Sequence, residues 1–375
     1  MHFAGCSNLS YVKLPENLTT IYSSAFNRCT SLTEISLPSL LTKIDGTAFS
    51  NCPNLDNIDT SKNMNFIYED NILMTSNKEE ILFIANKALK NVNTFSIPDG
   101  IKSWNYSLSS YSNIKILNIP KSLESINISL IPLAIENIVV DQNNANFYVE
   151  NECLYSYDKK KLLLAFTKND TVILNQNVEN IGEYSFMCAP NITSVTLPET
   201  ILSIGEQAFS RCKKLETLYL GKNINSIDPL FAYNIHNVHL IVDNENNNYS
   251  VETTENGDIL YNKDKTTLIS VIYQIQGTFN LANTVKVIGH YAFHYQDQMT
   301  SIILPEGLTE ISYSFNYCRG LTEIIIPSTV EKISSMAFNG TDNLTKIHID
   351  KPKDSISGSP WGAIRGNRIV EWRSN

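Results

Sequence analysis

The chain has 375 residues, of which 42% are hydrophobic and 18% charged, a composition that folds rather than stays disordered. Its net charge is −9, and no run of lysine and arginine is long enough to form a basic stripe, which argues against nucleic acid as a partner. No apolar stretch approaches the roughly 18 residues that a membrane-spanning helix requires.

The sequence repeats itself with a period of 23 residues. The first copy has Leu9, Val12, Leu14, Pro15, Leu18, Ile21, Ala25, Phe26 and Cys29. The same residue types return at Leu32, Ile35, Leu37, Pro38, Leu41, Ile44, Ala48, Phe49 and Cys52. Such a period predicts stacked supersecondary units, because one unit cannot bury its own apolar face. Phe3 aligns with Phe26, so the chain begins within a repeat, and we expect a preceding part with a cap, an export signal or both.

Each repeat predicts one coil of a solenoid. Ile35, Ser36 and Leu37 alternate between apolar and polar side chains, as in a short strand with one buried face. Pro38 then ends the strand, because proline has no N–H for pairing. Strands one repeat apart run in the same direction, so we expect a parallel sheet on the concave side. The opposite wall should bury a row of phenylalanines: Phe26, Phe49, Phe186, Phe209, Phe293, Phe315 and Phe338.

Most of the seven cysteines share one position of the repeat: Cys6, Cys29, Cys52, Cys212 and Cys318. We expect a ladder of small, buried side chains at this position. The odd total, with Cys153 and Cys188 off the ladder, argues against a disulfide framework.

Three segments interrupt the repeat: Phe66–Ile84, Phe147–Phe166 and Tyr249–Tyr273. Each contains two apolar runs around a short polar turn, which predicts a β-hairpin that projects from the solenoid or extends its sheet. Between residues 92 and 140 the repeat is weaker, and the Ala-Phe pair is lost.

The pattern L-x-x-I-x-L-P…A-F-x-x-C resembles the BspA-like leucine-rich repeat family, also called the Treponema pallidum type. The insert at Gly257–Leu268 and the tail Pro360–Trp372 are also similar to segments of that family. The resemblance implies an α/β-class repeat solenoid, a right-handed superhelix that is mostly β with short coils and 3-10 turns. It implies a solenoid over residues 1–349, with hairpin inserts near 66–84, 147–166 and 249–273, and a C-terminal cap over 350–375.

No motif in the sequence points to catalysis, a cofactor or a metal. There is no His-Glu-x-x-His, P-loop or Gly-x-Ser-x-Gly pattern, although spacing does not exclude a Ser-His-Asp set built from distant residues. His290 and His294 flank a coil rather than share a helix face, which argues against a zinc site.

Asp- and Asn-rich segments precede all three inserts: Asp59–Asn65, Asp141–Asn146 and Asp243–Asn248. Their local backbone preferences predict turns. Calcium binding is the alternative, because the segments are rich in side-chain oxygen.

The strand positions that face away from the core are the candidate binding residues. On the concave face we single out Glu34, Ser36, Thr217, Tyr219, Ile303, Glu323, Ile325, Lys346 and His348. Apolar and aromatic side chains such as Tyr219, Ile303 and Ile325 are able to anchor a partner. The alternative is an ordinary solvated sheet face.

The repeat, the resemblance and the lack of a catalytic motif together predict a non-catalytic binding protein. The resemblance implies a bacterial protein that is secreted or at the cell surface and mediates adhesion. Its partner would be a protein or a glycan of a host or neighbouring cell, bound by the concave sheet and the hairpins. Two alternatives remain open: a structural spacer that presents another domain, and an enzyme with a site between a hairpin and the sheet.

Overall fold

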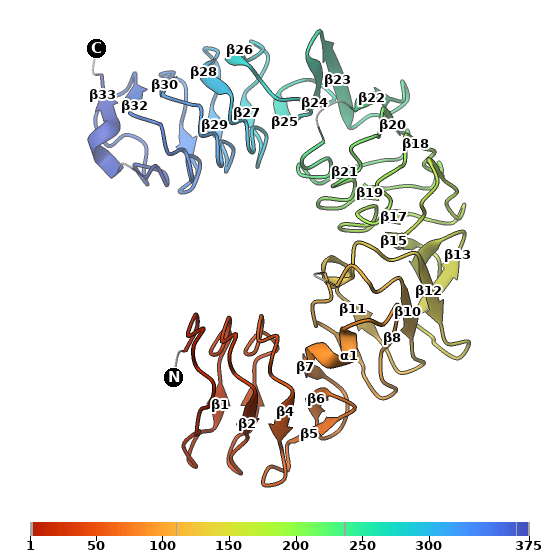
Figure 1. Ribbon diagram of the computed structural model, residues 1–375. Coiled ribbons are helices and arrows are strands. Elements are labelled where there is room, and N and C mark those ends of the chain that lie inside the picture. Colours follow the sequence, from red (N-terminus) through yellow and green to blue (C-terminus); the bar gives the residue numbers. More distant parts are fainter. Residues whose placement is uncertain (1–2, 110, 236–237, 365, 374–375) are drawn as a thin grey trace. The chain divides into compact units, whose positions relative to one another are not determined.

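The computed structural model describes residues 3–109, 111–235, 238–364 and 366–373. The chain forms two compact units, one of Met1–Lys159 with Leu163–Thr167 and one of Lys160–Leu162 with Lys168–Asn375. Each unit is a stack of coils built from short parallel strands with almost no helix (Figure 1). This confirms the predicted mostly-β repeat solenoid. The single solenoid over residues 1–349 and the cap over 350–375 remain predictions.

The predicted strand of each repeat pairs in parallel with that of a neighbouring coil, in sheets of two to four strands that together are called the first ladder. In the first unit it contains β2 (Glu34–Ser36), β4 (Asn57–Asp59), β8 (Thr94–Ser96), β10 (Ile116–Ile119) and β12 (Asn137–Val140). In the second unit it contains β16 (Thr171–Val172), β18 (Ser194–Val195), β20 (Thr217–Leu220), β22 (His239–Val242), β26 (Gly277–Asn280), β28 (Met299–Ile303), β30 (Glu323–Ile326), β32 (Lys346–Ile349) and β33 (Val370–Trp372). Paired residues one coil apart, such as Ile35 and Ile58, have the same chemical type and the same burial.

A second set of parallel strands, the second ladder, forms at a position of the repeat for which no strand was predicted. In the first unit it contains β1 (Thr20–Ile21), β3 (Lys43–Ile44), β9 (Ser103–Trp104) and β11 (Ser125–Ile126). In the second unit it contains β17 (Asn180–Ile181), β19 (Ser203–Ile204), β21 (Ser226–Ile227), β27 (Val287–Ile288), β29 (Glu310–Ile311) and β31 (Lys332–Ile333). Two extended residues suffice for pairing here, because stacking already holds the same residues of the next coil beside them.

Each insert is an antiparallel set of strands that ends in the second ladder. The sets are β5 (Phe66–Glu69), β6 (Ile72–Thr75) and β7 (Ile81–Ile84); β13 (Phe147–Glu150), β14 (Cys153–Ser156) and β15 (Lys161–Ala165); and β23 (Tyr249–Thr254), β24 (Gly257–Asn262) and β25 (Thr267–Val271). The predicted hairpins are confirmed, and they extend a sheet: Thr267 of β25 pairs in parallel with Val287 of β27. Helical structure among the described residues is limited to α1 (Asn86–Leu89) and the 3-10 turns η1 (Ile128–Leu130) and η2 (Gly366–Ile369).

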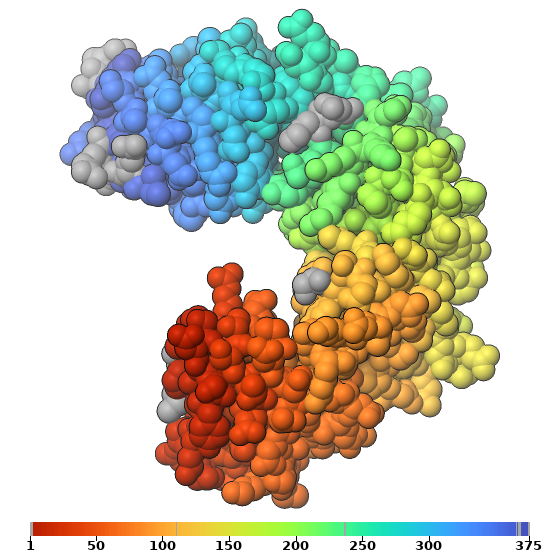
Figure 2. Space-filling model, viewed as in Figure 1, coloured from red at the N-terminus to blue at the C-terminus, as the bar shows by residue number. Residues whose placement is uncertain are grey.

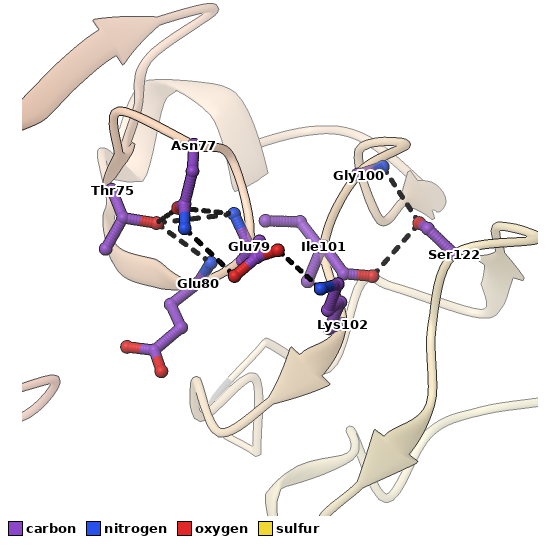
Figure 3. Close-up of polar contacts among 8 residues, drawn as sticks. All are labelled: Thr75, Asn77, Glu79, Glu80, Gly100, Ile101, Lys102 and Ser122. Carbon is purple, nitrogen blue, oxygen red and sulfur yellow. Dashed lines mark hydrogen bonds and ion pairs between the residues drawn. The ribbon is translucent and has the colours of Figure 1, made fainter.

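The turn of the first insert shows how an insert is tied to the following coil (Figure 3). The Thr75 hydroxyl accepts the backbone N–H of Glu80 at 3.2 Å. The carboxylate of Glu79 lies 2.5 Å from the Lys102 ammonium, and the Lys102 N–H donates to the Glu79 carbonyl. These contacts place Glu80 beside Ser103 in a parallel bridge, so the insert replaces a strand of the second ladder.

The coils pack tightly along each stack, and Figure 2 shows the first of them as adjacent bands of atoms. The predicted row of phenylalanines is buried throughout. Phe26 stacks on Phe49 with ring centroids 5.5 Å apart, and Phe186 stacks on Phe209 at 4.7 Å. The rings sit in the core because each Ala-Phe turn also hydrogen-bonds to the next coil: the Phe186 N–H donates to the Ala208 carbonyl.

The cysteine ladder is buried except at its first member, Cys6, which is exposed. The prediction was wrong for Cys6, which no coil covers on its N-terminal side among the described residues. The other rungs are small apolar side chains that also donate: the thiol of Cys52 lies 3.0 Å from the Phe26 carbonyl of the preceding coil. Burial raises the pKa of the Cys52 thiol to about 11 and that of Cys212 to about 12, so both are unreactive thiols at neutral pH.

The Asn-rich segments before the inserts are turns, and in each a buried asparagine side chain hydrogen-bonds to backbone groups of the preceding coil. Buried Asn246 donates from Nδ2 to the carbonyls of Gly221 and Ile224 at 2.8 and 3.1 Å. Its Oδ1 accepts the N–H groups of Asn248 and Tyr249. The same arrangement recurs at Asn63 and Asn144. The turn interpretation therefore accounts for these segments, because the amides are fully used in backbone contacts.

Replacing Phe209 with Ala should lower the free energy of unfolding by about 3–5 kcal/mol, because the ring is fully buried and stacked. Chemical denaturation of both proteins measures this difference. Ile303→Ala, at a side chain that is 59% exposed, is the control and should change stability by about 0.5 kcal/mol or less. An equal effect of the two changes would place Phe209 outside the core.

Replacing Asn246 with Ala should cost about 1–3 kcal/mol, because two buried carbonyls lose their donors. The isosteric Asn246→Asp change should cost at least as much at neutral pH, because a carboxylate then faces those carbonyls. Denaturation at pH 7 and pH 5 should show Asn246→Asp regaining stability as the carboxyl is protonated. Asn247→Ala, at an exposed neighbour, is the control. An Asn246→Ala variant as stable as wild type would contradict the structural role of Asn246.

Candidate functional site

The first-ladder face of the second unit is the surface formed by the outward side chains of β16 through β32. Alternation along each strand exposes every second residue: in β30, Ile324 and Ile326 are buried, whereas Glu323 and Ile325 are exposed. In-register pairing then aligns the outward side chains of neighbouring strands, as for Tyr219 and Ile241. The face is therefore a direct consequence of the repeat.

Most of the predicted binding residues do point outward. Glu34 and Ser36 are exposed in the first unit, where they pair with Asn57 and Asp59. On the first-ladder face of the second unit the outward residues are Thr217, Tyr219, Ile303, Glu323, Ile325 and Lys346. Because the predicted residues are divided between two units, only those of the second unit are taken as one surface.

His348 is a correction, because it is buried rather than available to a partner. Strand β33 pairs in parallel with β32 and brings Glu371 beside His348. The Nδ1 atom of His348 lies 2.9 Å from the Glu371 carboxylate and 3.0 Å from the Arg373 guanidinium. The sequence prediction assigned this segment to a C-terminal cap, although β33 follows β32 by one full period of 23 residues.

Tyr219 is held in place although its ring is 42% exposed. Its hydroxyl donates a short hydrogen bond to the Asp243 carboxylate. This bond raises the pKa of the Tyr219 hydroxyl and lowers the pKa of the Asp243 carboxyl. The ring is therefore presented in one orientation, and a partner would not need to order it.

Further exposed apolar residues at outward positions of the first-ladder strands were not predicted from the sequence. Ile241 is 43% exposed beside Tyr219, and Ile173, directly after β16, is 69% exposed. In the first unit Val139 of β12 is 49% exposed. Their signal was the repeat itself: Ile173 precedes Tyr219 by two full periods. They were overlooked because only the clearest copies of the repeat were aligned.

One titratable pair lies between the third insert and the first ladder. The buried Asp258 of β24 accepts the Leu240 N–H at 2.5 Å, and the same carboxylate oxygen lies 2.9 Å from Nδ1 of His239. The insert interrupts the ladder after β22, so Leu240 has no next strand to pair with. Asp258 therefore serves as a cap for that strand edge.

A cavity of about 360 Å³ opens in the second unit next to the third insert, among the turns that contain Tyr233 and Tyr291. We call it the tyrosine pocket. It is lined by Pro229, Leu230, Ala232, Tyr233, Asn234, Ile235, Ser270, Val271, Ile272, Gln274, Tyr291, Ala292, His294, Tyr295, Gln296, Asp297 and Arg319. The aromatic lining has a sequence signal that was not used: Tyr291-Ala-Phe-His-Tyr295 returns 22 residues later as Tyr313-Ser-Phe-Asn-Tyr317.

A model of the BspA type leucine rich repeat region matches residues 1–88, 164–254 and 274–361 in six copies. These ranges cover more than half of the sequence, and the chain belongs to this family. Leucine-rich repeat proteins generally bind other proteins, and the family is generally non-enzymatic.

Solved structures with a similar fold include three bacterial proteins. A leucine-rich repeat protein from Eubacterium ventriosum is 21% identical with a TM-score of 0.47, over 88% of this chain and 81% of that one. The pneumococcal vaccine antigen PcpA is 17% identical with a TM-score of 0.41, over 83% and 88%. A leucine rich cell surface protein from Faecalibacterium prausnitzii is 17% identical with a TM-score of 0.36, over 83% and 96%. Among curated proteins, none matches the sequence.

Two further findings concern the described part of the chain. None of its helices has the length and apolar character needed to cross a membrane. Within the same residues, no group of three or more His, Cys, Asp or Glu side chains is placed to hold a metal ion.

The stability of the second unit should depend on pH through His294. Burial lowers the pKa of His294 to about 4 from its ordinary value of 6.5. The unfolded chain therefore binds a proton between about pH 6.5 and pH 4 that the folded chain does not, and the free energy of unfolding falls as the pH is lowered through this window.

Denaturation curves of wild type and His294→Phe at pH 7 and pH 4.5 test this expectation. The variant should lose less stability on acidification than the wild type. His290→Phe, at an exposed histidine of the same coil, is the matched control. Equal acid sensitivity of His294→Phe and wild type would contradict the assignment.

Proposed function

We propose that the protein is a non-catalytic binding protein that engages a protein partner through the first-ladder face, with the inserts as flanking contacts. The supporting observation is the row of apolar side chains on that face. Tyr219 and Ile241 on the paired strands β20 and β22, and Ile303 and Ile325 on β28 and β30, are 42–59% exposed at one outward position, which Asn280 of β26 occupies between the two pairs. Contiguous exposed apolar groups on a folded surface mark interaction sites more often than solvated faces.

The composition of the face suits a protein partner. Fully burying an isoleucine contributes about 1.5–3 kcal/mol, and Ile303, which is 59% exposed, would gain more than half of that against a partner. Tyr219 adds an aromatic ring that Asp243 already orients, which lowers the entropy cost of binding. Charged Glu323 and Lys346 sit beside each other at the neighbouring outward position, where they would favour one docking orientation.

Membership of the family also supports a proposal about where the protein is located. Because BspA-like proteins are associated with bacterial surfaces and adhesion, we place this chain at the cell surface or outside the cell. Its partner would then be a protein of a host or of a neighbouring cell.

The double change Tyr219→Ala with Ile325→Ala should weaken partner binding by about tenfold or more, since such anchors carry most of the energy of an interface. The assay is binding of the full chain to a panel of purified matrix proteins and mucins, followed by titration of any protein that binds.

The matched control is Tyr157→Ala with Met336→Ala, which removes two side chains that are 58% and 45% exposed outside the first-ladder face. Control and wild type should bind alike. Failure of every panel protein to bind, or equal binding by the Tyr219 and Ile325 variant, would remove the support for this function.

A further inference from the structure

The tyrosine pocket exists because the third insert breaks the stack of coil turns. Where the repeat is regular, successive turns bond directly, and the Phe315 N–H donates to the Ala337 carbonyl at 2.9 Å. At the insert, the turn that contains Tyr233 is followed by β22 and then by β23–β25, and the next regular coil begins at β26 (Figure 1). The end of β25 takes over the pairing, with the Val271 N–H donating to the Ala292 carbonyl. The two turns are thus held apart.

Aromatic rings line the gap from both turns. The ring of Tyr233 lies 5.7 Å from that of Tyr295 and 5.8 Å from His294, in tilted arrangements that leave ring faces free of close stacking. His294 meets Tyr291 edge to face at 5.2 Å. All four rings are only partly buried, so they form the surface of a cavity rather than a filled core.

Contacts outside the cavity hold the ring of Tyr295 in place. Tyr295 stacks on Tyr317 at 4.9 Å, and the Arg319 guanidinium lies over both rings at 5.7 and 5.5 Å. Gly340 allows Tyr317 to lie flat, because a Cβ at that position would come within 2.5 Å of the ring. The pocket is therefore rigid on this side before any ligand arrives.

The polar groups of the pocket are neutral or already compensated. Arg319 lies 3.6 Å from the Asp297 carboxylate and 3.7 Å from the Asp342 carboxylate, so its positive charge is compensated and the three groups together carry one net negative charge. His294 is neutral at pH 7, since its pKa is about 4. A neutral imidazole has one donating and one accepting nitrogen. The side chains of Asn234 and Gln274 add amide groups to the lining.

We propose that the tyrosine pocket binds a neutral sugar ring, such as a hexose or an N-acetylhexosamine at the end of a glycan. Sugar hydroxyls both donate and accept, which matches the imidazole and the amides, and the C–H face of a sugar packs on the electron-rich face of a tyrosine. The volume of about 360 Å³ lies within the range of small-molecule sites. An anion would find no uncompensated positive charge in the lining.

This site is separate from the first-ladder face and does not depend on the function proposed for it. The experiment is a screen of the full-length chain against an array of neutral mono- and oligosaccharides, with titration calorimetry of each sugar that binds. Tyr233→Ala and His294→Phe should each weaken binding by about tenfold or more. Tyr233→Phe keeps the ring and should bind within about threefold of wild type.

The first-ladder variant Tyr219→Ala with Ile325→Ala is the control that separates the two proposals, and it should bind the sugar as wild type does. Thermal unfolding of each variant checks that it folds. The proposal is overturned if no neutral sugar binds, if Tyr233→Ala and His294→Phe bind as wild type does, or if tetramethylammonium occupies the pocket in place of a sugar.

Discussion

Pairing of each coil with the next is the constraint on which the rest of this structure depends. A coil of about 23 residues is too small to bury its own leucines, isoleucines and phenylalanine, and it leaves strand edges without partners on both sides. The next coil supplies the missing partners at the first ladder, the second ladder and the Ala-Phe turn. The side chains that point inward are thereby committed to packing. Recognition is left to the outward positions and to the places where the stack is interrupted.

The inserts show how strictly this constraint applies. Each insert adds two antiparallel strands, but its third strand or adjoining turn still pairs in parallel with the following coil. Before each insert, a buried asparagine occupies the carbonyls that a regular coil would have used. Asp258 does the same for an unpaired N–H of β22. The buried asparagines of these oxygen-rich segments, together with Asp258, thus satisfy the backbone groups that the breaks in the stack leave unpaired.

The two proposed binding sites arise from different features of the repeat. The first-ladder face results from regularity, since in-register pairing aligns Tyr219 with Ile241 and repeats an apolar group on later coils. The tyrosine pocket results from irregularity, since the third insert separates two turns that would otherwise touch. A solenoid that mixes perfect repeats with inserts therefore offers an extended surface for a protein and a local cavity for a small ligand on the same unit.

The sequence by itself determined the coil, the inward and outward positions and the location of the inserts, because all of these follow from local alternation and a fixed period. It correctly placed the buried phenylalanines, most of the cysteine ladder and the exposure of Tyr219, Ile303 and Ile325. Only the tertiary structure decided the second ladder, the burial of His348 under β33 and the tyrosine pocket. These depend on which segments far apart in the chain come to lie side by side. The apolar pattern alone does not show whether a further period, such as β33, pairs with the stack or where a gap opens within it.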